Sequence, residues 1–476
     1  MLAWKSGAVA GGSDSSGYMN NARLIAASHA TAPIRSVAGI PPEKAPGYLY
    51  VPLGFRPSAD GAALVPTYPV GFALFIAASS ALVGWPSAGC LAAVLHAVAG
   101  ILASFALFRA LNLGLRWALV GAVVIAASPL YLFMSLQAMS DVPSLFWTTF
   151  AVWAAITGRA RSPWTLVAGF AFAVDVLLRP TNALALAPLA VALGAAPRRW
   201  LQFAAGGLPG ALFLAAYNHA AYGRAITTGY GDVSGLLRLS YVPQTLVHFS
   251  LWLPALFTPL VVMAAALPWL RGVAPWIRLM LVVWMAAFSG FYSMYYCSHE
   301  SWGYVRFLLP MAPALVGSAL LVLQAACSRM RQSLDPARSL RTLAVALCLV
   351  LLISGSWVRH LRALNIGDGE RRYGRVARWL EATTPHDAVI VCMQASGALF
   401  YFTDRTIVRW DMLGALSAEQ LESAVRKSGR PLYAVLFPFE LNDSGALSRH
   451  VPGDWKLVGR VDDVTVWRAG SPAPGL

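Results

Sequence analysis

Residues 86–108, PSAGCLAAVLHAVAGILASFALF, form an apolar run without a single acid, lysine or arginine. A helix of about 20 such residues is long enough to cross the hydrocarbon core of a bilayer. Similar runs follow along the chain, at 117–137, 142–158, 163–178, 181–196, 200–217, 250–270, 277–296, 303–326 and 341–357. The sequence therefore predicts an α-helical polytopic membrane protein with about 10–11 transmembrane helices. The two short runs on either side of LLRPTN (177–182) are expected to form a hairpin.

The composition supports this class and argues against several others. Hydrophobic residues make up 58% of the 476 residues and charged residues 12%, against about 25% charged in a soluble domain. The formal net charge of +15 fits Lys and Arg retained in cytoplasmic loops. No basic stripe interleaves with aromatic residues, so we expect no nucleic-acid binding. The five cysteines show no metal-binding spacing, and we do not expect Cys297 and Cys392, the one plausible pair, to form a disulfide.

The distribution of basic residues predicts which loops lie on the cytoplasmic side. Clusters of arginine occur at every second junction between runs, near 109–116, 159–161, 198–199, 271–278 and 329–341. These clusters share one side only if YPVGFALFIAASSALVG (68–84) does not cross the membrane. We therefore expect 68–84 to be a juxtamembrane or re-entrant helix at the outer interface. An outer loop so near the start needs a span before it, and we expect that MLAWKSGAVA (1–10) ends a longer first span. The alternative is an N-terminus that lies outside.

Three domains are expected along the chain: a first outer loop with juxtamembrane helices at 1–85, a transmembrane helical domain at 86–357, and a small C-terminal α/β domain outside the membrane at 358–476. In the last, RRYGRVARWLEATT (371–384) has the pattern of an amphipathic helix, followed by Pro385. SAEQLESAVRKSG (417–429) predicts a second helix that ends at Gly429. DAVIVCM, LYAVLFPFE and VTVWRA, which begin at residues 387, 432 and 464, predict strands.

Three acidic residues lie at positions where they could take part in catalysis or ligand binding. Asp14 is in the loop stretch SDSSGY (13–18), before an expected interfacial helix, SGYMNNARLIAASH (16–29). Asp141, in MSDVPS, lies at an outer turn, and Asp175 is four residues before Arg179, which would let the two pair on one helix face. Each has a plainer interpretation: a solvated loop acid for Asp14, a helix N-cap for Asp141, and a structural ion pair for Asp175 and Arg179.

Cations and aromatic residues gather in the expected outer segments. Arginine can hold a phosphate through two parallel hydrogen bonds, and aromatic rings offer a flat face to a sugar at the interface. An acid close by could accept a proton from an attacking hydroxyl or amine, while a cation stabilises a leaving phosphate. Asp14 and Asp141 are thus the candidate catalytic residues. The candidate substrate-binding residues are Arg306, Tyr18, Lys44, Arg56, Tyr68, Arg179 and Glu300.

Several motifs together resemble the GT-C superfamily of membrane glycosyltransferases, in the bacterial branch of the protein O-mannosyltransferases and the lipid A aminoarabinose transferase. They occur in the same order over nearly the whole chain and are SDSSGY, YPVGFALFIA, SPLYLFMSLQAMSDVPS, LLRPTN, SWGYVRFLLPMAP and, in the tail, VARWLEATTPHDAVIVCMQASGALFYFTDRTIVRWD. In this resemblance Asp14 matches the acid of the first outer loop, Asp141 a second outer-loop acid, and Arg306 a basic residue near the lipid phosphate.

The resemblance implies an inverting glycosyltransferase that takes a hexose or pentose from a polyprenyl-phosphate-linked donor. The active site and C-terminal domain would face the periplasm from a bacterial inner membrane, among membrane lipids, and the acceptor would be a lipid, a glycan or a protein. Relatives often have two adjacent acids in the first loop, whereas Ser15 and Ser16 follow Asp14. We therefore expect no cofactor, because a divalent metal usually needs more than one such oxygen ligand. The alternatives are a transporter or lipid flippase, and a non-catalytic membrane scaffold.

Overall fold

The computed structural model describes residues 2–45, 47–331, 336–413 and 418–470. The chain divides into two compact units. The helical unit comprises Met1–Lys5, Ala92–Leu214 and Asp232–Ile366, and the mixed unit comprises Ser6–Leu91, Ala215–Gly231 and Gly367–Leu476. The three domains expected from the sequence divide the chain along its length and stay a prediction.

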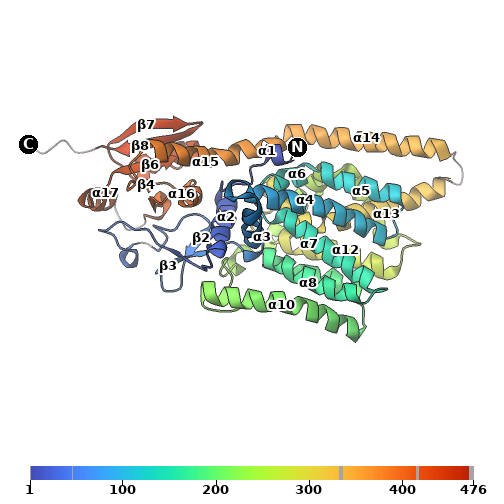
Figure 1. Cartoon of the computed structure of the whole chain (residues 1–476). Coiled ribbons are helices and arrows are strands. Elements are labelled where there is room, and N and C mark those ends of the chain that lie inside the picture. The colour runs from blue at the N-terminus through green and yellow to red at the C-terminus, as the bar shows by residue number, and fades with distance from the viewer. Residues whose placement is uncertain (1, 46, 332–335, 414–417, 471–476) are drawn as a thin grey trace, which may run out of the picture. The chain divides into compact units, whose positions relative to one another are not determined.

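Apolar helices build the helical unit, and each expected apolar run coincides with helical structure. In Figure 1 α7 and α8 run side by side in this unit. The helices are α4 (Trp85–Ala110), α5 (Leu115–Ala127), α6 (Pro129–Ser135), α7 (Asp141–Gly158), α8 (Pro163–Leu178), α9 (Leu186–Leu193), α10 (Pro197–Tyr222), α11 (Val242–Phe257), α12 (Pro275–Ser293), α13 (Ala312–Arg331) and α14 (Pro336–His360), with 3₁₀ segments η2 (Pro180–Ala185), η5 (Pro259–Trp269) and η6 (Trp302–Met311). The fold is therefore that of a polytopic helical membrane protein.

Fewer of these helices are long, straight spans than the runs suggested. Within the described residues, three segments are long and apolar enough to cross a membrane alone: Trp85–Ala110, Pro275–Ser293 and Trp302–Ser328. Three bent pairs would raise the number to six. The candidate span at 250–270 is not one straight helix, because α11 and η5 meet at a bend of 113°. Thr258 has a φ of +94° and precedes Pro259, and a residue before proline is disfavoured in the helical region.

Small residues bring neighbouring helices of this unit close together. A methyl group added at Gly169 of α8 would lie 1.9 Å from the backbone oxygen of Phe203 in α10. One added at Gly206 of α10 would lie 2.0 Å from the oxygen of Leu166 in α8. Glycine thus lets the two backbones approach each other, as at many helix contacts in membranes. Larger side chains fill the centre, where Trp284 and Phe288 of α12 are fully buried.

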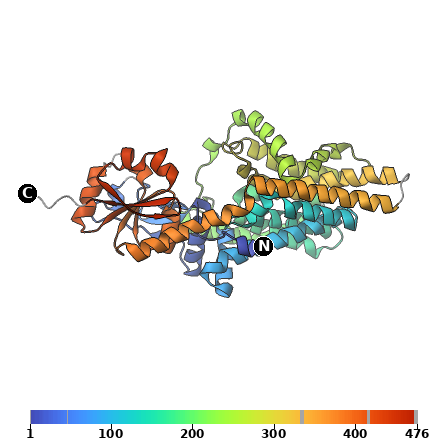
Figure 2. The same cartoon turned by 90° about the horizontal axis from the view of Figure 1, so that it is seen from above.

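The C-terminal part of the mixed unit is an α/β layer structure, as the sequence predicted. Its five-stranded sheet has the order β5-β4-β6-β8-β7, parallel at β5-β4-β6 and antiparallel at β6-β8-β7. The strands are β4 (Val389–Val391), β5 (Thr406–Val408), β6 (Leu432–Leu436), β7 (Trp455–Val461) and β8 (Val464–Ala469). The helices α15 (Ile366–Thr383), α16 (Ser396–Phe402) and α17 (Ala418–Lys427) accompany it, and Figure 2 shows helices on both sides of the sheet. The PFE end of the second expected strand, LYAVLFPFE, is instead part of α18 (Pro438–Asn442).

Successive side chains along the strands point to opposite faces of the sheet and pack into two separate hydrophobic cores. Val389 and Val391 of β4 pack with Leu421 of α17 in one cluster. Ile390 packs with Leu380 of α15 and Leu399 of α16 in the other. Side chains of successive strand residues point to opposite faces, so β4 is buried on both. Each face of the sheet is therefore covered by helix.

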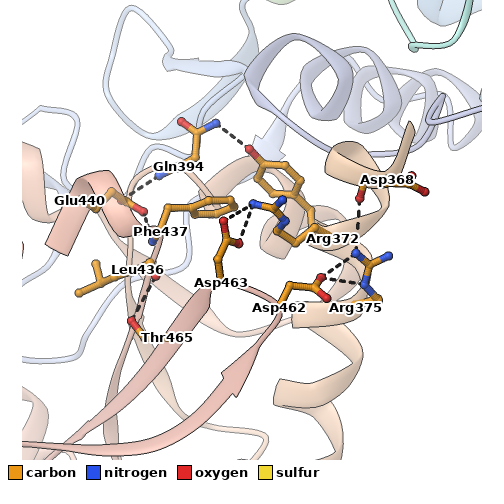
Figure 3. Close-up of polar contacts among 11 residues, drawn as sticks. Asp368, Arg372, Arg375, Gln394, Leu436, Phe437, Glu440, Asp462, Asp463 and Thr465 are labelled. Atoms are coloured by element: carbon orange, nitrogen blue, oxygen red, sulfur yellow. Dashed lines mark hydrogen bonds and ion pairs between the residues drawn. The ribbon is translucent and has the colours of Figure 1, made fainter. Parts of the chain in front are cut away.

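Ion pairs attach α15 to the hairpin between β7 and β8. Figure 3 shows Arg372 reaching Asp463 and Arg375 reaching Asp462. Both pairs are partly exposed, with nitrogen–oxygen distances of 2.6 Å. Exposed pairs of this kind contribute about 0.2–1 kcal/mol each. They fix the hairpin against the helix, while the apolar core supplies most of the stability.

We expect Gly459→Ala to lower the free energy of unfolding by about 1–3 kcal/mol, as overpacking does. A methyl group at Gly459 in β7 would lie 2.2 Å from the Trp379 ring of α15. Gly369→Ala is the matched control, because nothing lies within 4 Å of its added methyl group and alanine favours the helix. Thermal unfolding in detergent should therefore show a lower midpoint for the first variant and an unchanged or higher one for the second. Equal midpoints would contradict this packing.

The N-terminal part of the mixed unit holds the stretch SDSSGY. It comprises α2 (Ser13–Ala26), a small antiparallel sheet of β1 (Ala32–Pro33), β2 (Phe55–Pro57) and β3 (Ala63–Pro66), and α3 (Val70–Val83). At 14 residues α3 is shorter than a typical span, and the expectation that 68–84 is juxtamembrane or re-entrant stays a prediction. Packing of α2 on α3 and on α16 builds the N- and C-terminal parts of the sequence into one unit.

Candidate functional site

Asp14 lies in the first turn of a helix and not in a flexible loop as the sequence suggested. The expected interfacial helix begins at Ser13, three residues early, and so includes the acid. A carboxylate is stabilised at this end of a helix, where backbone N–H groups and the helix dipole present positive charge. Asp14 is half-buried. The helix fixes the direction in which its side chain projects.

Tyr68 is the neighbour that orients the Asp14 carboxylate. The Tyr68 hydroxyl donates to Asp14 Oδ1 at 2.5 Å and lies 3.0 Å from Ser13 Oγ. The Tyr68 ring lies against that of Tyr18, with centroids 5.2 Å apart. Glycine at position 17 makes room for it, since a methyl group there would lie 2.3 Å from the Tyr68 ring. The stretch SDSSGY thus supplies both the acid, Asp14, and, at Gly17, the space that the Tyr68 ring occupies.

Burial and the Asp14 carboxylate raise the pKa of the Tyr68 hydroxyl well above its ordinary value. Tyr68 therefore stays protonated at physiological pH and acts as a donor. A carboxylate that accepts one such bond keeps a fixed orientation. This is the geometry expected of a general base that must meet a proton at a defined place.

We expect Tyr68→Phe to lower the rate of any reaction that uses Asp14 as a base by about 10-fold or more, because a charge-assisted hydrogen bond is worth about 1.5–3 kcal/mol. The ring contact with Tyr18 remains in this variant, so the expressed, folded amount should change little. Tyr48→Phe is the control, because Tyr48 is exposed. An unchanged rate for Tyr68→Phe would remove this hydrogen bond from the mechanism.

A second acid, Glu370 of α15, lies at the same turn of α2. Its side chain is buried, and Oε2 accepts a hydrogen bond from the Gly12 N–H at 3.3 Å. The Ser15 side chain also hydrogen-bonds to it. Burial is the main cause that raises the Glu370 pKa to about 7, while the charge of Asp14 raises it further and the bonds from Ser15 and Gly12 lower it.

The Glu370 pKa predicts a pH dependence of stability. Because it rises from 4.5 to about 7 on folding, the native state binds more protons between these values. The stabilisation that Glu370 gives the native state is fully present below about pH 4.5 and is lost as the pH rises through 7. The loss in the free energy of unfolding is on the order of 3 kcal/mol. The titratable groups that face Glu370 are Asp14 from α2 and Tyr373 from its own helix. Glu370→Gln should flatten this part of the curve, and parallel curves of thermal midpoint against pH would contradict it.

The helical unit has its own charged cluster, centred on Asp141. Asp141 is the first residue of α7 and is fully buried. Arg179 binds its Oδ1 at 2.8 Å and also donates from Nε to Ser140 Oγ at 2.9 Å. Arg306 lies 4.0 Å from Oδ2. Two guanidinium groups against one carboxylate leave one net positive charge, so the cluster favours an anion.

Aromatic side chains lie beside the two guanidinium groups. Arg179 and Arg306 lie 5.7 Å and 5.3 Å from the centre of the Phe307 ring. Phe307 stacks on Tyr292 at 5.0 Å, and the Tyr292 hydroxyl lies 2.8 Å from Thr181 Oγ1. Rings and cations at these distances attract each other. The cluster therefore combines a surplus positive charge with flat apolar faces.

Arg179 does not share one helix face with Asp175, as the sequence suggested. α8 ends at Leu178, and Arg179 is extended, with φ −151° and ψ 117°, so the spacing of four is not a helical spacing here. Asp175 instead accepts hydrogen bonds from Asn182 Nδ2 at 2.7 Å and Thr148 Oγ1 at 2.5 Å. This contact ties α7, α8 and η2 together and is structural.

The remaining candidate residues are spread over both units. Lys44 and Glu300 are exposed. Arg56 donates to the backbone oxygens of Thr228 and Gly229, at 3.4 Å each. Substrate binding by these three residues and by the buried Tyr18 stays a prediction, as does a catalytic role for Asp141.

Glu370 and Ser140 were missed in the sequence. For Glu370 a signal was present, since it shares a helix face with Gly367, Tyr373 and Gly374, all buried. An acid on the buried face of an amphipathic helix is uncommon. For Ser140 there was no comparable signal. Among the described residues no three His, Cys, Asp or Glu side chains are grouped as a metal ion would need.

Comparison with known proteins gives matches to solved structures. No protein-family model matches the sequence, and a comparison with curated proteins finds no match. ArnT from Cupriavidus metallidurans, bound to undecaprenyl phosphate, is similar with a TM-score of 0.56 and 17% identity, over 96% of this chain and 94% of that one. Its apo state gives a TM-score of 0.53 at 16% identity, over 93% and 96% of the two chains.

An archaeal structure has a similar fold. The oligosaccharyltransferase AglB from Archaeoglobus fulgidus, in complex with an inhibitory peptide and a dolichol-phosphate, gives a TM-score of 0.51 at 11% identity. The match covers 89% of this chain and 65% of AglB. At such identities the likeness shows the fold alone, and this chain has a fold similar to those of ArnT and AglB.

Proposed function

We propose that this protein is an integral-membrane glycosyltransferase that moves a sugar from a polyprenyl-phosphate-linked donor to an acceptor at the outer face of the membrane. The observation that carries the proposal is the likeness, over 96% of the chain, to the structure of ArnT bound to undecaprenyl phosphate. The localisation proposed with it is a bacterial inner membrane, with the C-terminal α/β part in the periplasm. The acceptor is a lipid, a glycan or a protein.

In this proposal the Asp141 cluster binds the lipid phosphate. Arg179 and Arg306 supply guanidinium groups that can each form two parallel bonds to phosphate oxygens. Asp141 holds Arg179 at 2.8 Å and so orients it before the donor arrives. As the bond from the anomeric carbon to the phosphate oxygen breaks, negative charge grows on the phosphate, and fixed cations stabilise it.

Asp14 is proposed as the general base. The acceptor oxygen or nitrogen attacks the anomeric carbon from the side opposite the phosphate and loses its proton to the Asp14 carboxylate. The bond between the carbon and the phosphate oxygen breaks with its electron pair, and polyprenyl phosphate leaves. The new glycosidic bond then has the inverted configuration. This step needs no cofactor, because Asp14 takes the proton and polyprenyl phosphate leaves with the bonding electron pair.

The test is turnover of a panel of radiolabelled polyprenyl-phosphate sugars by proteoliposomes that contain the full-length protein and an envelope-lipid extract as acceptor. We expect label to leave at least one donor and to enter a product that is no longer cleaved by the mild acid that cleaves the donor. Arg306→Gln should raise the KM for that donor, whereas Arg378→Gln, from α15, should not. Donor that crosses the bilayer with its label intact would instead support a flippase, and would overturn the proposal.

A further inference from the structure

Glu370 sits where it can control the placement of Asp14. Its Oε2 accepts from the Gly12 N–H, and the Ser15 side chain also bonds to its carboxyl group. Asp14 lies between these two residues in the sequence, on the first turn of α2. The N-cap of α2 is Gly12, which has no side chain that could cap this turn. Glu370 therefore binds the N-cap N–H from another helix, as the acid of a capping box does within one helix.

The backbone around this contact is built for close approach. A methyl group at Gly11 would lie 2.1 Å from Glu370 Oε2, and one at Gly7 would lie 2.5 Å from the Gly367 Cα. Glycine at positions 7 and 11 thus lets α15 lie against the segment that leads into α2. On α15 the neighbouring polar groups are occupied elsewhere, as Arg372 and Arg375 hold the β7–β8 turn (Figure 3).

We propose that Glu370 is a positioning residue, which sets the geometry of Asp14 by holding the first turn of α2 through Gly12 and Ser15. This inference rests on the proposed function, in which Asp14 is the base. Glu370 itself touches no reacting atom in the proposal. Because a misplacement of about 1 Å can cost about 100-fold in rate, loss of the contact should reduce catalysis and leave donor binding intact.

The experiment compares Glu370→Ala, Glu370→Gln and Glu381→Ala in the full-length protein. Glu381 is the matched control, since it is an exposed acid of the same helix. We expect Glu370→Ala to lower kcat by on the order of 10- to 100-fold with the KM for the donor within about twofold. Glu370→Gln should restore most of kcat, because its amide oxygen can still accept from Gly12. A loss confined to KM, or equal values for Glu370→Ala and Glu381→Ala, would overturn the inference.

Hydrogen exchange provides a readout that does not depend on turnover. Amides of 12–16 should exchange faster in Glu370→Ala than in wild type and Glu381→Ala, while those of α17 stay unchanged. If wild type turns over no donor, the proposed function fails, and this exchange alone decides whether Glu370 holds the turn. If Glu370→Ala does not fold, Gly11→Ala takes its place, since the added methyl group would displace the carboxyl group. Unchanged exchange in the folded variant would overturn the inference.

Discussion

Asp14→Asn is expected to lower kcat for sugar transfer by on the order of 10²- to 10⁴-fold, the range that a general base contributes. The substitution keeps the side chain's size and an oxygen that can accept the bond from Tyr68, and it removes the carboxylate that would take the acceptor's proton. Expression and the KM for the donor should stay close to wild type. The measurement is initial rate against donor concentration in proteoliposomes.

Asp60→Asn is the control for this prediction. Asp60 is an exposed acid in the same N-terminal part, bonded to Ser58 and to the Ala62 N–H, and its loss should leave the rate unchanged. An Asp14→Asn protein with a wild-type rate would show that Asp14 is a structural acid of the first helical turn. In that case Asp141 would be the next residue to test as the base.

Asp141→Asn is expected to lower the free energy of unfolding by about 3–5 kcal/mol, because it leaves buried cations without their counter-charge. Arg179 lies 2.8 Å and Arg306 4.0 Å from the Asp141 carboxylate, which is fully buried. An amide of the same size can still bond to one of them but cannot balance their charge. Thermal unfolding in detergent measures the loss, and undecaprenyl phosphate, as an added anion, should recover part of it by binding the native state.

A double-mutant cycle tests the origin of this loss. Adding Arg179→Gln to Asp141→Asn should cost less than the sum of the two single changes, because the double variant no longer leaves that cation unpaired. Strict additivity would show that the two side chains do not interact in the native protein. A stability of Asp141→Asn equal to wild type would contradict the buried ion pair itself.

The helices could be predicted from the sequence because one property decides them. In a bilayer every backbone polar group must be satisfied within the segment, so long apolar runs become helices. Length alone did not reveal the bend in 250–270, although Pro259 was visible, because prolines are tolerated in many membrane helices. Apolar stretches likewise indicated β4, β6 and β8, whereas β5 and β7 were not predicted.

The site could be predicted only as residue types, and its contacts could not. Asp14 was found because an acid in a polar loop next to apolar runs is conspicuous. Tyr68, which bonds to Asp14, and Glu370, which holds the same helical turn, are 54 and 356 positions away. Only tertiary packing brings them together. The pairing of Arg179 with Asp141 depends on where α8 ends, and helix ends are uncertain by one or two residues. Arg179 is the first residue beyond α8 and is extended, so its direction does not follow from a helical spacing.

The most direct test of the central claim counts both products of a single reaction. Wild-type protein in proteoliposomes receives a donor labelled in both the sugar and the polyprenyl phosphate, together with the acceptor extract. The account predicts that free polyprenyl phosphate and glycosylated acceptor appear in equal amounts, and that Asp14→Asn forms neither at the wild-type rate. Polyprenyl phosphate released together with free sugar, or donor moved across the bilayer intact, would contradict a transferase.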